Sequence, residues 1–219
     1  MQMNRVILTY SQLPWQLPAS LPKAWRAQWR ARLSYAHALR LSADAGAQSQ
    51  TLLGVALACR LLSAASGRRV EPAELRYSEH GKPRVPGLPE FSIAHEGGWV
   101  LCALASAGAV GVDVEPLVMP ASLPCWRWVF DAEERAAAGS PHAALAIWTA
   151  KEAVLKAAGA SRKELPRVQV RGHHAQFAGR RWHCRTPRFA PRMVARLATA
   201  LPVSNVLLQA VPASLALAL

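Results

Sequence analysis

Trp148-Thr-Ala-Lys-Glu-Ala-Val-Leu-Lys-Ala-Ala-Gly159 is the segment from which the rest of the chain can be interpreted. Ser140 and Pro141, upstream of it, are typical of a helix N-cap and a first helical residue. Gly159 is typical of a left-handed C-terminal cap. The sequence therefore predicts one helix that begins at Pro141, is rich in Ala and Leu, and ends at Ala158.

A carboxylate lies on the apolar face of this predicted helix. At about 100° per residue, Leu145, Trp148 and Leu155 fall on one side, and Glu152 falls among them. A buried carboxylate is costly unless a cation, a metal ion or hydrogen bonds compensate it. Lys156 follows one turn later on the same face, so an ordinary exposed Glu–Lys pair is the alternative interpretation.

The composition predicts a globular protein with anionic partners. The 219 residues are 52% hydrophobic and 18% charged, which is enough to bury a full core. Lys and Arg number 26 against 13 Asp and Glu, so the formal net charge is +13. Such a surface favours nucleic acid, an anionic membrane, a phosphate-rich small molecule or an acidic protein, and net charge alone does not choose among them.

The cysteines and the N-terminal residues predict a cytoplasmic location. The cysteines are far apart and form no CxxC pair, which is typical of reduced core thiols: Cys59, Cys102, Cys125 and Cys184. The first ten residues are too short in apolar length for a signal peptide, and no apolar run reaches about 18 residues. We therefore expect a soluble cytoplasmic protein that does not bind membranes.

The remaining chain predicts alternating helical and extended segments. The first part has a strand at Val6–Tyr10, a helix with Trp25, Trp29 and Leu33 on one side, an apolar helix at about Gln50–Ser66 closed by Gly67, and strands at Phe91–His95 and Trp99–Ser106. The second part has the helix already described, a hairpin at Val168–Arg185, and strands at Arg192–Thr199 and Val206–Val211.

An Ala- and Leu-rich helix, followed by extended segments and an apolar strand, thus occurs twice. This recurrence predicts an α+β fold of two similar halves related by a pseudo-twofold axis, with an active site in the cleft between them. The predicted halves are residues 1–110 and residues 111–219.

Two acidic residues alternate with valines at the start of the second half. In Gly111-Val-Asp-Val-Glu115, Val112 and Val114 face one way, and Asp113 and Glu115 face the other, about 7 Å apart along a strand. Two carboxylates at this spacing can bind one divalent cation, although such pairs are also common on solvated strands.

Together with Glu152, these acids suggest a magnesium site. Mg²⁺ prefers hard oxygen ligands and shares its coordination with phosphate and water. The candidate ligands are Asp113, Glu115 and Glu152, and the nearby cations or donors are Lys82, His95 and Lys156. Such a set fits a diphosphate substrate, and the reaction is either phosphoryl transfer or hydrolysis.

Four short motifs resemble one enzyme family. They are Gly81-Lys-Pro83, Phe91-Ser-Ile-Ala-His95, Gly111-Val-Asp-Val-Glu115 and Trp148-x-x-Lys-Glu-Ala-x-x-Lys156. Their order and spacing are similar to those of the 4'-phosphopantetheinyl transferases of the surfactin-synthetase-activating type. The motifs span about residues 77–159, and the combination is far more specific than any one motif.

The resemblance implies a reaction and a role for each matching residue. The phosphopantetheine arm of coenzyme A would pass to a serine of an acyl or peptidyl carrier protein, releasing 3',5'-ADP. Asp113, Glu115 and Glu152 would hold Mg²⁺, Glu152 would also take the serine proton, and Lys156 would neutralise the diphosphate.

Other matching residues would bind coenzyme A. The resemblance places Lys82 and His95 at its phosphates, and Gly81 and Pro83 in the turn beside its adenine. We expect an acidic carrier protein to dock on the basic surface of a monomer, and no nucleic-acid partner.

Three positions depart from the family pattern. Ala94 stands where the family has Ser, and Glu96 replaces a small polar residue. Gln50 precedes Gly54 by four residues, where the family tends to carry an Arg for the 3'-phosphate of coenzyme A. Recognition of that phosphate is then either weakened or moved to a residue such as Arg40 or Lys23, and we expect weaker discrimination between coenzyme A and 3'-dephospho-coenzyme A.

Two other functions are compatible with the residues. One is a Mg²⁺-dependent hydrolase of coenzyme A or nucleotide diphosphates, which would use the same acids without a carrier protein. The other is a basic nucleic-acid-binding module in which the acids are structural, and this one predicts steeply salt-dependent binding.

Overall fold

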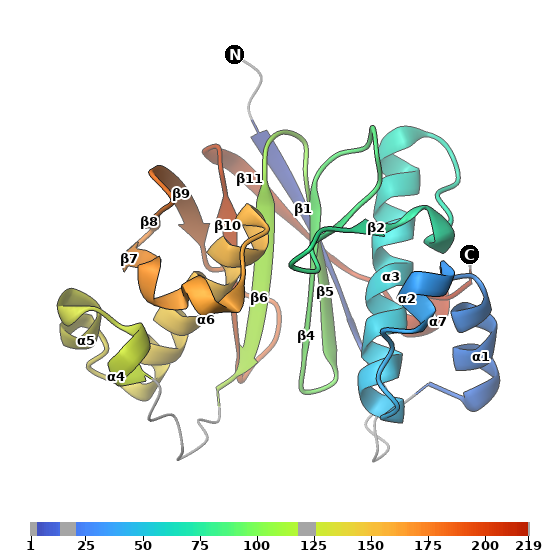
Figure 1. The fold of residues 1–219 in the computed structure, drawn as a ribbon, viewed down its shortest axis with the longest axis horizontal. Coiled ribbons are helices and arrows are strands. Elements are labelled where there is room, and N and C mark those ends of the chain that lie inside the picture. Colours follow the sequence, from blue (N-terminus) through green and yellow to red (C-terminus); the bar gives the residue numbers. More distant parts are fainter. Residues whose placement is uncertain (1–3, 14–20, 118–125, 219) are drawn as a thin grey trace.

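A computed structural model of the chain describes residues 4–13, 21–117 and 126–218 (Figure 1). The first sheet has the strand order β11-β1-β5-β4. Its strands are β1 (Asn4–Gln12), β4 (Phe91–Glu96), β5 (Trp99–Ala105) and β11 (Val203–Ala210). The second sheet has the order β6-β10-β9-β8-β7. Its strands are β6 (Val110–Pro116), β7 (Gln169–Arg171), β8 (His174–Phe177), β9 (Arg180–Arg185) and β10 (Met193–Thr199).

The helices lie mainly on the outer faces of these sheets. The α-helices are α1 (Lys23–Ala31), α2 (Tyr35–Ala38), α3 (Ala45–Ser66), α4 (Trp126–Val129), α5 (Ala132–Ala137), α6 (Pro141–Ala158) and α7 (Ala213–Ala216). The 3-10 helices are η1 (Pro72–Glu74) and η2 (Arg162–Arg167), and a small hairpin joins β2 (Arg76–Tyr77) to β3 (Pro83–Arg84). The mixture of sheets and helices agrees with the predicted α+β class. None of the described helices combines the length and apolar character needed to span a membrane.

Local capping fixes the ends of the two long helices. Ser140 accepts a hydrogen bond from the amide of Ala143, and Gly159 has φ 66°, so the predicted ends of α6 are confirmed. Gly67 closes α3 with φ 68°, as predicted. However, α3 begins at Ala45 rather than near Gln50, because the Asp44 side chain caps it by accepting from Ala47.

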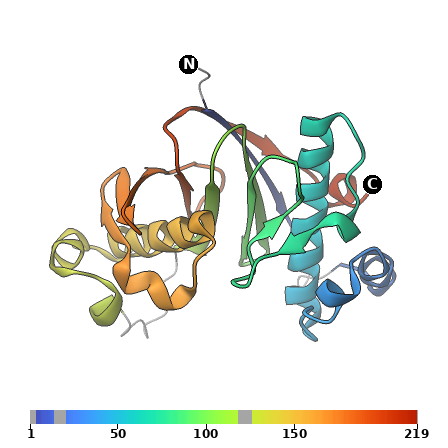
Figure 2. The same cartoon turned by 45° about the horizontal axis from the view of Figure 1, so that its top comes forward.

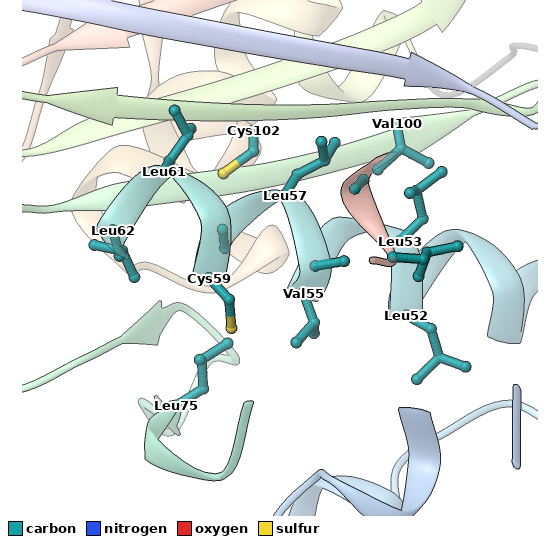
Figure 3. Close-up of a cluster of buried hydrophobic side chains, with 14 of the residues drawn as sticks. Leu52, Leu53, Val55, Leu57, Cys59, Leu61, Leu62, Leu75, Val100 and Cys102 are labelled. Carbon is teal, nitrogen blue, oxygen red and sulfur yellow. The ribbon is translucent and has the colours of Figure 1, made fainter. Parts of the chain in front are cut away.

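Three apolar clusters stack the elements into layers. Leu57 and Leu61 of α3 point toward the strand that carries Cys102 (Figure 3), where α3 covers one face of the first sheet. Helix α6 covers one face of the second sheet, through residues such as Ala153 and Val154. The two remaining sheet faces pack on each other, so the order of layers is α3, first sheet, second sheet, α6 (Figure 2).

Strand β6 has the alternation that the sequence predicts. Val112 and Val114 are buried in the core between the sheets, whereas Asp113 faces α6 and contacts Lys156. Gly111 also faces α6. An added Cβ there would lie 2.0 Å from the carbonyl oxygen of Ala153, so the absence of a side chain lets the helix approach the strand.

The two sheets share a topological pattern. In the first sheet, the elements follow along the chain in the order β1, α3, β4, β5, and the strands lie side by side in the order β1-β5-β4. In the second sheet, the order along the chain is β6, α6, β9, β10, and the strands lie in the order β6-β10-β9. The corresponding neighbours are antiparallel in both sheets. Strand β11, near the C-terminus, pairs parallel with β1, so the second part of the chain completes the first sheet.

The prediction of a single hairpin from Val168 to Arg185 is wrong. The segment forms three antiparallel strands, β7, β8 and β9. Gly172 and Gly179 have φ of 59° and 71°, and each supplies a turn. Cys59, Cys102 and Cys184 are buried free thiols, as expected, and Cys125 and the Pro-rich segments lie wholly or partly outside the described residues.

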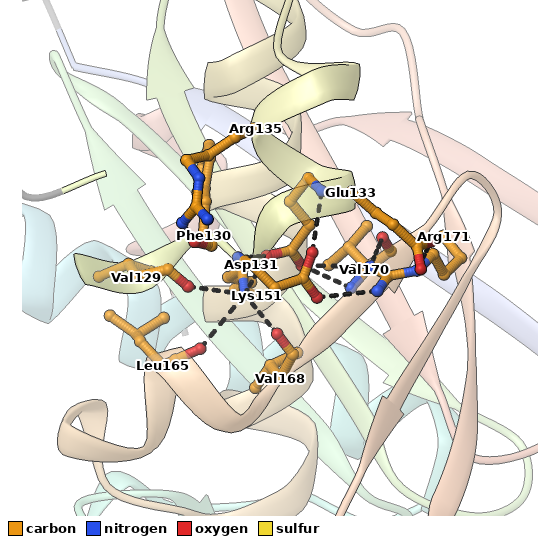
Figure 4. Close-up of polar contacts among 11 residues, drawn as sticks. Val129, Phe130, Asp131, Glu133, Arg135, Lys151, Leu165, Val168, Val170 and Arg171 are labelled. Atoms are coloured by element: carbon orange, nitrogen blue, oxygen red, sulfur yellow. Dashed lines mark hydrogen bonds and ion pairs between the residues drawn. The ribbon is translucent and has the colours of Figure 1, made fainter. Parts of the chain in front are cut away.

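A buried lysine anchors α6 on the side away from the first sheet. Lys151 has no exposed surface and lies 2.8 Å from Oε2 of Glu134 in α5, which is also fully buried. Its ammonium also donates to the backbone carbonyls of Val129, Leu165 and Val168 (Figure 4). The pair and its hydrogen bonds therefore fix α6 to the segments before and after it.

Gly111→Ala is expected to destabilise the protein by about 3 kcal/mol, because the new methyl group would meet α6 backbone that cannot rotate away. Urea unfolding followed by circular dichroism measures this. Gly139→Ala is the matched control, since a Cβ there meets nothing within 4 Å. Equal unfolding midpoints for the two variants would refute the close contact.

Lys151→Met is expected to cost about 3–5 kcal/mol of unfolding free energy, because it leaves the Glu134 carboxylate fully buried with only the more distant Arg171 guanidinium, at 3.9 Å, as counter-charge. Lys163→Met, at an exposed position of η2, is expected to stay within about 0.5 kcal/mol of the parent. The same unfolding measurement compares them. A Lys151→Met variant as stable as Lys163→Met would show that the buried pair does not anchor the helix.

Candidate functional site

A cavity of about 360 Å³ lies where the two parts of the chain meet. The first part contributes the turn at residues 80–83 and two residues of β4, Ser92 and Ile93. The second part contributes the last two turns of α6, including Glu152 and Lys156, and the segment that follows to residue 162. The predicted Gly81-Lys82-Pro83 turn and the KExxxK helix, far apart in sequence, therefore line one cavity.

The turn at Gly81 is tightly hydrogen-bonded. Gly81 has φ 81°, which favours glycine, and its amide donates to the carbonyl of Ser78 at 2.9 Å. The amide of Lys82 donates to the Ser78 hydroxyl at 3.1 Å. These bonds present Lys82 and Pro83 at the cavity wall.

Lys82 also connects the turn to α6. Its ammonium lies 2.7 Å from the carbonyl oxygen of Ala157 and 2.6 Å from Oε2 of Glu90. The Ala157 carbonyl belongs to the last turn of α6, where carbonyls lack helical partners, so a cation there is favourable. The ammonium predicted to meet a substrate phosphate thus has two protein partners, neither of which lines this cavity.

Glu152 is buried and paired. Its side chain is 7% exposed, and its Oε1 accepts from Nε of Arg162 at 2.5 Å. Burial raises the pKa of Glu152, as does the nearby Asp113 carboxylate, whereas Arg162 and Lys156 oppose the rise. A carboxylate in these surroundings can accept a proton more readily than an exposed one.

Asp113 has one oxygen in use and one without a partner. Its Oδ1 lies 2.7 Å from the Lys156 ammonium. Its Oδ2 is buried and has no hydrogen-bond partner among the residues that the structure describes. Burial raises the pKa of Asp113, and Lys156 opposes this rise. An unpaired buried carboxylate oxygen is unusual and needs an explanation, such as an ion.

Glu115 is half-buried at the end of β6. Burial raises its pKa to about 7, with further contributions from the Asp113 and Glu96 carboxylates, and the Trp148 indole opposes the rise by hydrogen bonding. The mutual effects show that Asp113, Glu115 and Glu152 share one electrostatic environment. Glu96, a departure from the family pattern, adds negative charge to it.

His95 is exposed near the end of β4 and is not among the residues that line the cavity. Partial desolvation lowers its pKa, and the Lys156 ammonium lowers it further. Ala94 is 2% exposed and packs in the core between the sheets, so its side chain points away from His95. Gln50 is half-buried in α3 and is not among the residues that line the cavity.

The donor chemistry of the site fits Mg²⁺. The candidate ligands are carboxylate oxygens, which Mg²⁺ prefers. Among them, Oδ2 of Asp113 is buried and has no hydrogen-bond partner within the described residues. Within the described residues, no group of three or more Asp, Glu, His or Cys side chains is placed so that together they could hold a metal ion, and this includes the predicted set of Asp113, Glu115 and Glu152. Mg²⁺ does not require such a group, because it commonly binds one or two carboxylates together with water and phosphate.

Arg162 is a site residue that the sequence analysis missed. It follows the C-cap of α6 and begins η2, whose N-cap is Ser161. Besides pairing with Glu152, its guanidinium carbon lies 5.8 Å from the centre of the Trp148 ring. A basic residue shortly after the glycine cap was the available signal, but nothing in the spacing indicates which acid it would meet.

Comparisons with known proteins agree with the motifs. Residues 109–204 match the family model described as the 4'-phosphopantetheinyl transferase superfamily. A 4'-phosphopantetheinyl transferase of Bacillus subtilis is 30% identical over 107 residues, 44% of this chain and 47% of the relative. The 4'-phosphopantetheinyl transferase Sfp of Bacillus subtilis (strain 168) is 39% identical over 70 residues, 30% of each chain.

A third relative has similar coverage. The 4'-phosphopantetheinyl transferase AcpT of Escherichia coli (strain K12) is 33% identical over 112 residues, 46% of this chain and 56% of the relative. The chain thus matches between about a third and just over half of the length of these curated relatives. The matched segment contains β6, α6 and η2, and with them Asp113, Glu152 and Arg162. Residues 109–204 thus match the 4'-phosphopantetheinyl transferase superfamily, the family that the motifs resemble.

Proposed function

We propose that the protein transfers the 4'-phosphopantetheine arm of coenzyme A to a serine of an acyl or peptidyl carrier protein and releases 3',5'-ADP. One observation carries the proposal: the Gly81-Lys82-Pro83 turn and the Glu152 and Lys156 side chains line one cavity, although about 70 residues separate them. The family assignment of residues 109–204 supports the same reaction.

In this proposal the basic side chains bind the diphosphate of coenzyme A. Lys156 lies beside Asp113 on the cavity wall and can turn toward an entering phosphate, since its side chain is 33% exposed. Lys82 and His95 would contact other phosphates, and the backbone at Gly81 and Pro83 would border the adenine. Lys156 would then stabilise negative charge as the bond to the leaving diphosphate breaks.

Glu152 would act as the general base. It lines the cavity from the inner face of α6, and burial raises its pKa, which favours transfer of a proton to it. The proton of the carrier serine would pass to the Glu152 carboxylate as the serine oxygen attacks phosphorus. The reaction needs no covalent enzyme intermediate, so positioning and charge neutralisation supply the catalysis.

Asp113, Glu115 and Glu152 would hold the Mg²⁺ ion. The unpaired Oδ2 of Asp113 supports this assignment. When bound, the ion would neutralise charge on the diphosphate. Lys156 contacts Asp113 and Arg162 contacts Glu152, so each cation opposes the rise in pKa that burial causes in its partner.

The partner and the organisation of the chain are part of the proposal. The net charge of +13 favours an acidic carrier protein, which would dock on the basic surface of a monomer in the cytoplasm. Residues 1–110 and 111–219 would be halves related by a pseudo-twofold axis. The repeated strand order β1-β5-β4 and β6-β10-β9 supports that relation.

The transfer predicts a gain of about 340 Da on the carrier serine. The experiment incubates an apo carrier protein with the protein, coenzyme A and Mg²⁺ and measures intact mass. Glu152→Gln is expected to slow the modification by about 100-fold or more, because the general base is lost. Removal of Mg²⁺ by a chelator is expected to abolish it.

Glu164→Gln is the matched control, since Glu164 pairs with Arg167 at the surface of η2. It should leave the rate unchanged. Coenzyme A cleaved without any carrier modification would favour the hydrolase instead. Nucleic-acid binding that depends steeply on salt and is unaffected by Asp113→Ala would favour the nucleic-acid module.

Weak selection for the 3'-phosphate is a further expected property. The protein should use 3'-dephospho-coenzyme A with a kcat/KM within about tenfold of that for coenzyme A, because Gln50 cannot form a charged pair with phosphate. Gln50→Arg should raise the preference for coenzyme A by about tenfold. Kinetics with both substrates test this, and equal changes for the two would argue against any role for position 50.

A further inference from the structure

Two buried carboxylates each have a basic partner, and of the two acids only Glu152 lines the cavity. Asp113 pairs with Lys156 at 2.7 Å, and Glu152 pairs with Arg162 at 2.5 Å. Both basic residues line the cavity. Each carboxylate therefore has a counter-charge before any metal ion arrives, and a divalent cation must compete with it.

The two basic residues are held differently. Lys156 belongs to α6, one turn from Glu152, and its side chain is 33% exposed. Arg162 stands on η2 beyond the end of α6, and its side chain is 71% exposed although Glu152 is 7% exposed. Its guanidinium lines the cavity and lies over the Trp148 ring, and because the side chain is largely exposed it keeps much of its hydration while it is paired with Glu152.

We propose that Arg162 is a positioning residue that makes cation binding at Glu152 depend on the diphosphate of the substrate. Without substrate, its guanidinium occupies the Glu152 carboxylate and opposes entry of the cation. With substrate, the guanidinium moves from the carboxylate to a phosphate oxygen of the diphosphate. This inference rests on the proposed function, because it takes a coenzyme A diphosphate as the ligand.

The charges account for this dependence. A divalent cation alone would have to displace the guanidinium into water, away from both the carboxylate and the ring. A diphosphate offers the displaced group new acceptors, because a guanidinium binds phosphate in a bidentate manner. The cation and the diphosphate should therefore bind with positive cooperativity, and Arg162 should be one source of it.

The test measures Mn²⁺ binding, as a probe for Mg²⁺, by electron paramagnetic resonance with and without coenzyme A. For the parent protein, coenzyme A should increase the affinity for Mn²⁺ by at least about tenfold, after correction for the Mn²⁺ that binds to free coenzyme A. Arg162→Gln should bind Mn²⁺ about three- to tenfold more tightly without coenzyme A, because the competing charge is gone, and gain less from coenzyme A.

Arg167→Gln is the matched control. It removes the same charge from the same 3-10 helix, but Arg167 pairs with Glu164 and is 70% exposed. It should behave as the parent does, whereas Arg162→Lys should be intermediate, because a Lys keeps the charge but not the bidentate geometry. If Arg167→Gln changed the Mn²⁺ affinity as much as Arg162→Gln does, the loss of one positive charge would explain the effect, and the inference would be overturned.

Identical Mn²⁺ affinities for the parent and Arg162→Gln without coenzyme A would also overturn it. The outcome can be separated from failure of the proposed function, because carrier modification is followed on the same samples by intact mass. If the carrier is modified but the parent and Arg162→Gln bind Mn²⁺ equally well, the inference about Arg162 is refuted and the proposed transfer reaction is not. If the carrier is not modified but the Mn²⁺ affinities are as expected, the proposed transfer reaction is refuted and the competition between Arg162 and the cation is supported.

Discussion

The buried ion pair between Lys151 and Glu134 is the interaction on which the geometry of the site depends. Lys151 and Glu152 are consecutive in α6, so their side chains diverge by about 100° around the helix axis. Lys151 is held by the Glu134 carboxylate, by the carbonyl of Val129, which precedes α6 in the sequence, and by the carbonyl of Val168, which follows it. With that side fixed, Glu152 and Lys156 can only face the cavity.

The close approach of α6 to β6 completes this arrangement. Gly111 removes the side chain that would separate the helix from the strand, and the next inward residue, Asp113, comes within 2.7 Å of Lys156. A wider spacing would break this pair and leave a buried carboxylate without a cation. One glycine and one buried lysine thus set the distance and the rotation of the helix that carries the candidate base.

Features that depend on neighbours in sequence could be predicted from the sequence alone. The caps of α6 at Ser140 and Gly159, and the alternation of Val112 and Asp113 in β6, are examples, because each follows from local backbone chemistry. Contacts between distant segments could not be predicted in the same way. Lys82 meets Ala157 across 75 positions, and no periodicity relates the two.

There are also physical reasons why the sequence did not indicate some of the important residues. The analysis of α6 followed its apolar stripe, and Lys151 lies outside that stripe, so its burial depends on Glu134 in another helix. Arg162 lies beyond the helix cap, where helical periodicity no longer applies, and its partner is set by the path of η2. The three-stranded end of the second sheet was missed because a second glycine turn divides the predicted hairpin.

The walls of the cavity are held together by contacts between parts of the chain that are distant in sequence. Lys82 joins the Gly81 turn to the last turn of α6, and Ser92 of β4 accepts the amide of Val112 in β6 at 3.1 Å. Strand β11 returns to pair with β1, so the second part of the chain also closes the first sheet. Because these links cross from one part to the other, a ligand that entered the cavity would meet walls that are already joined to each other.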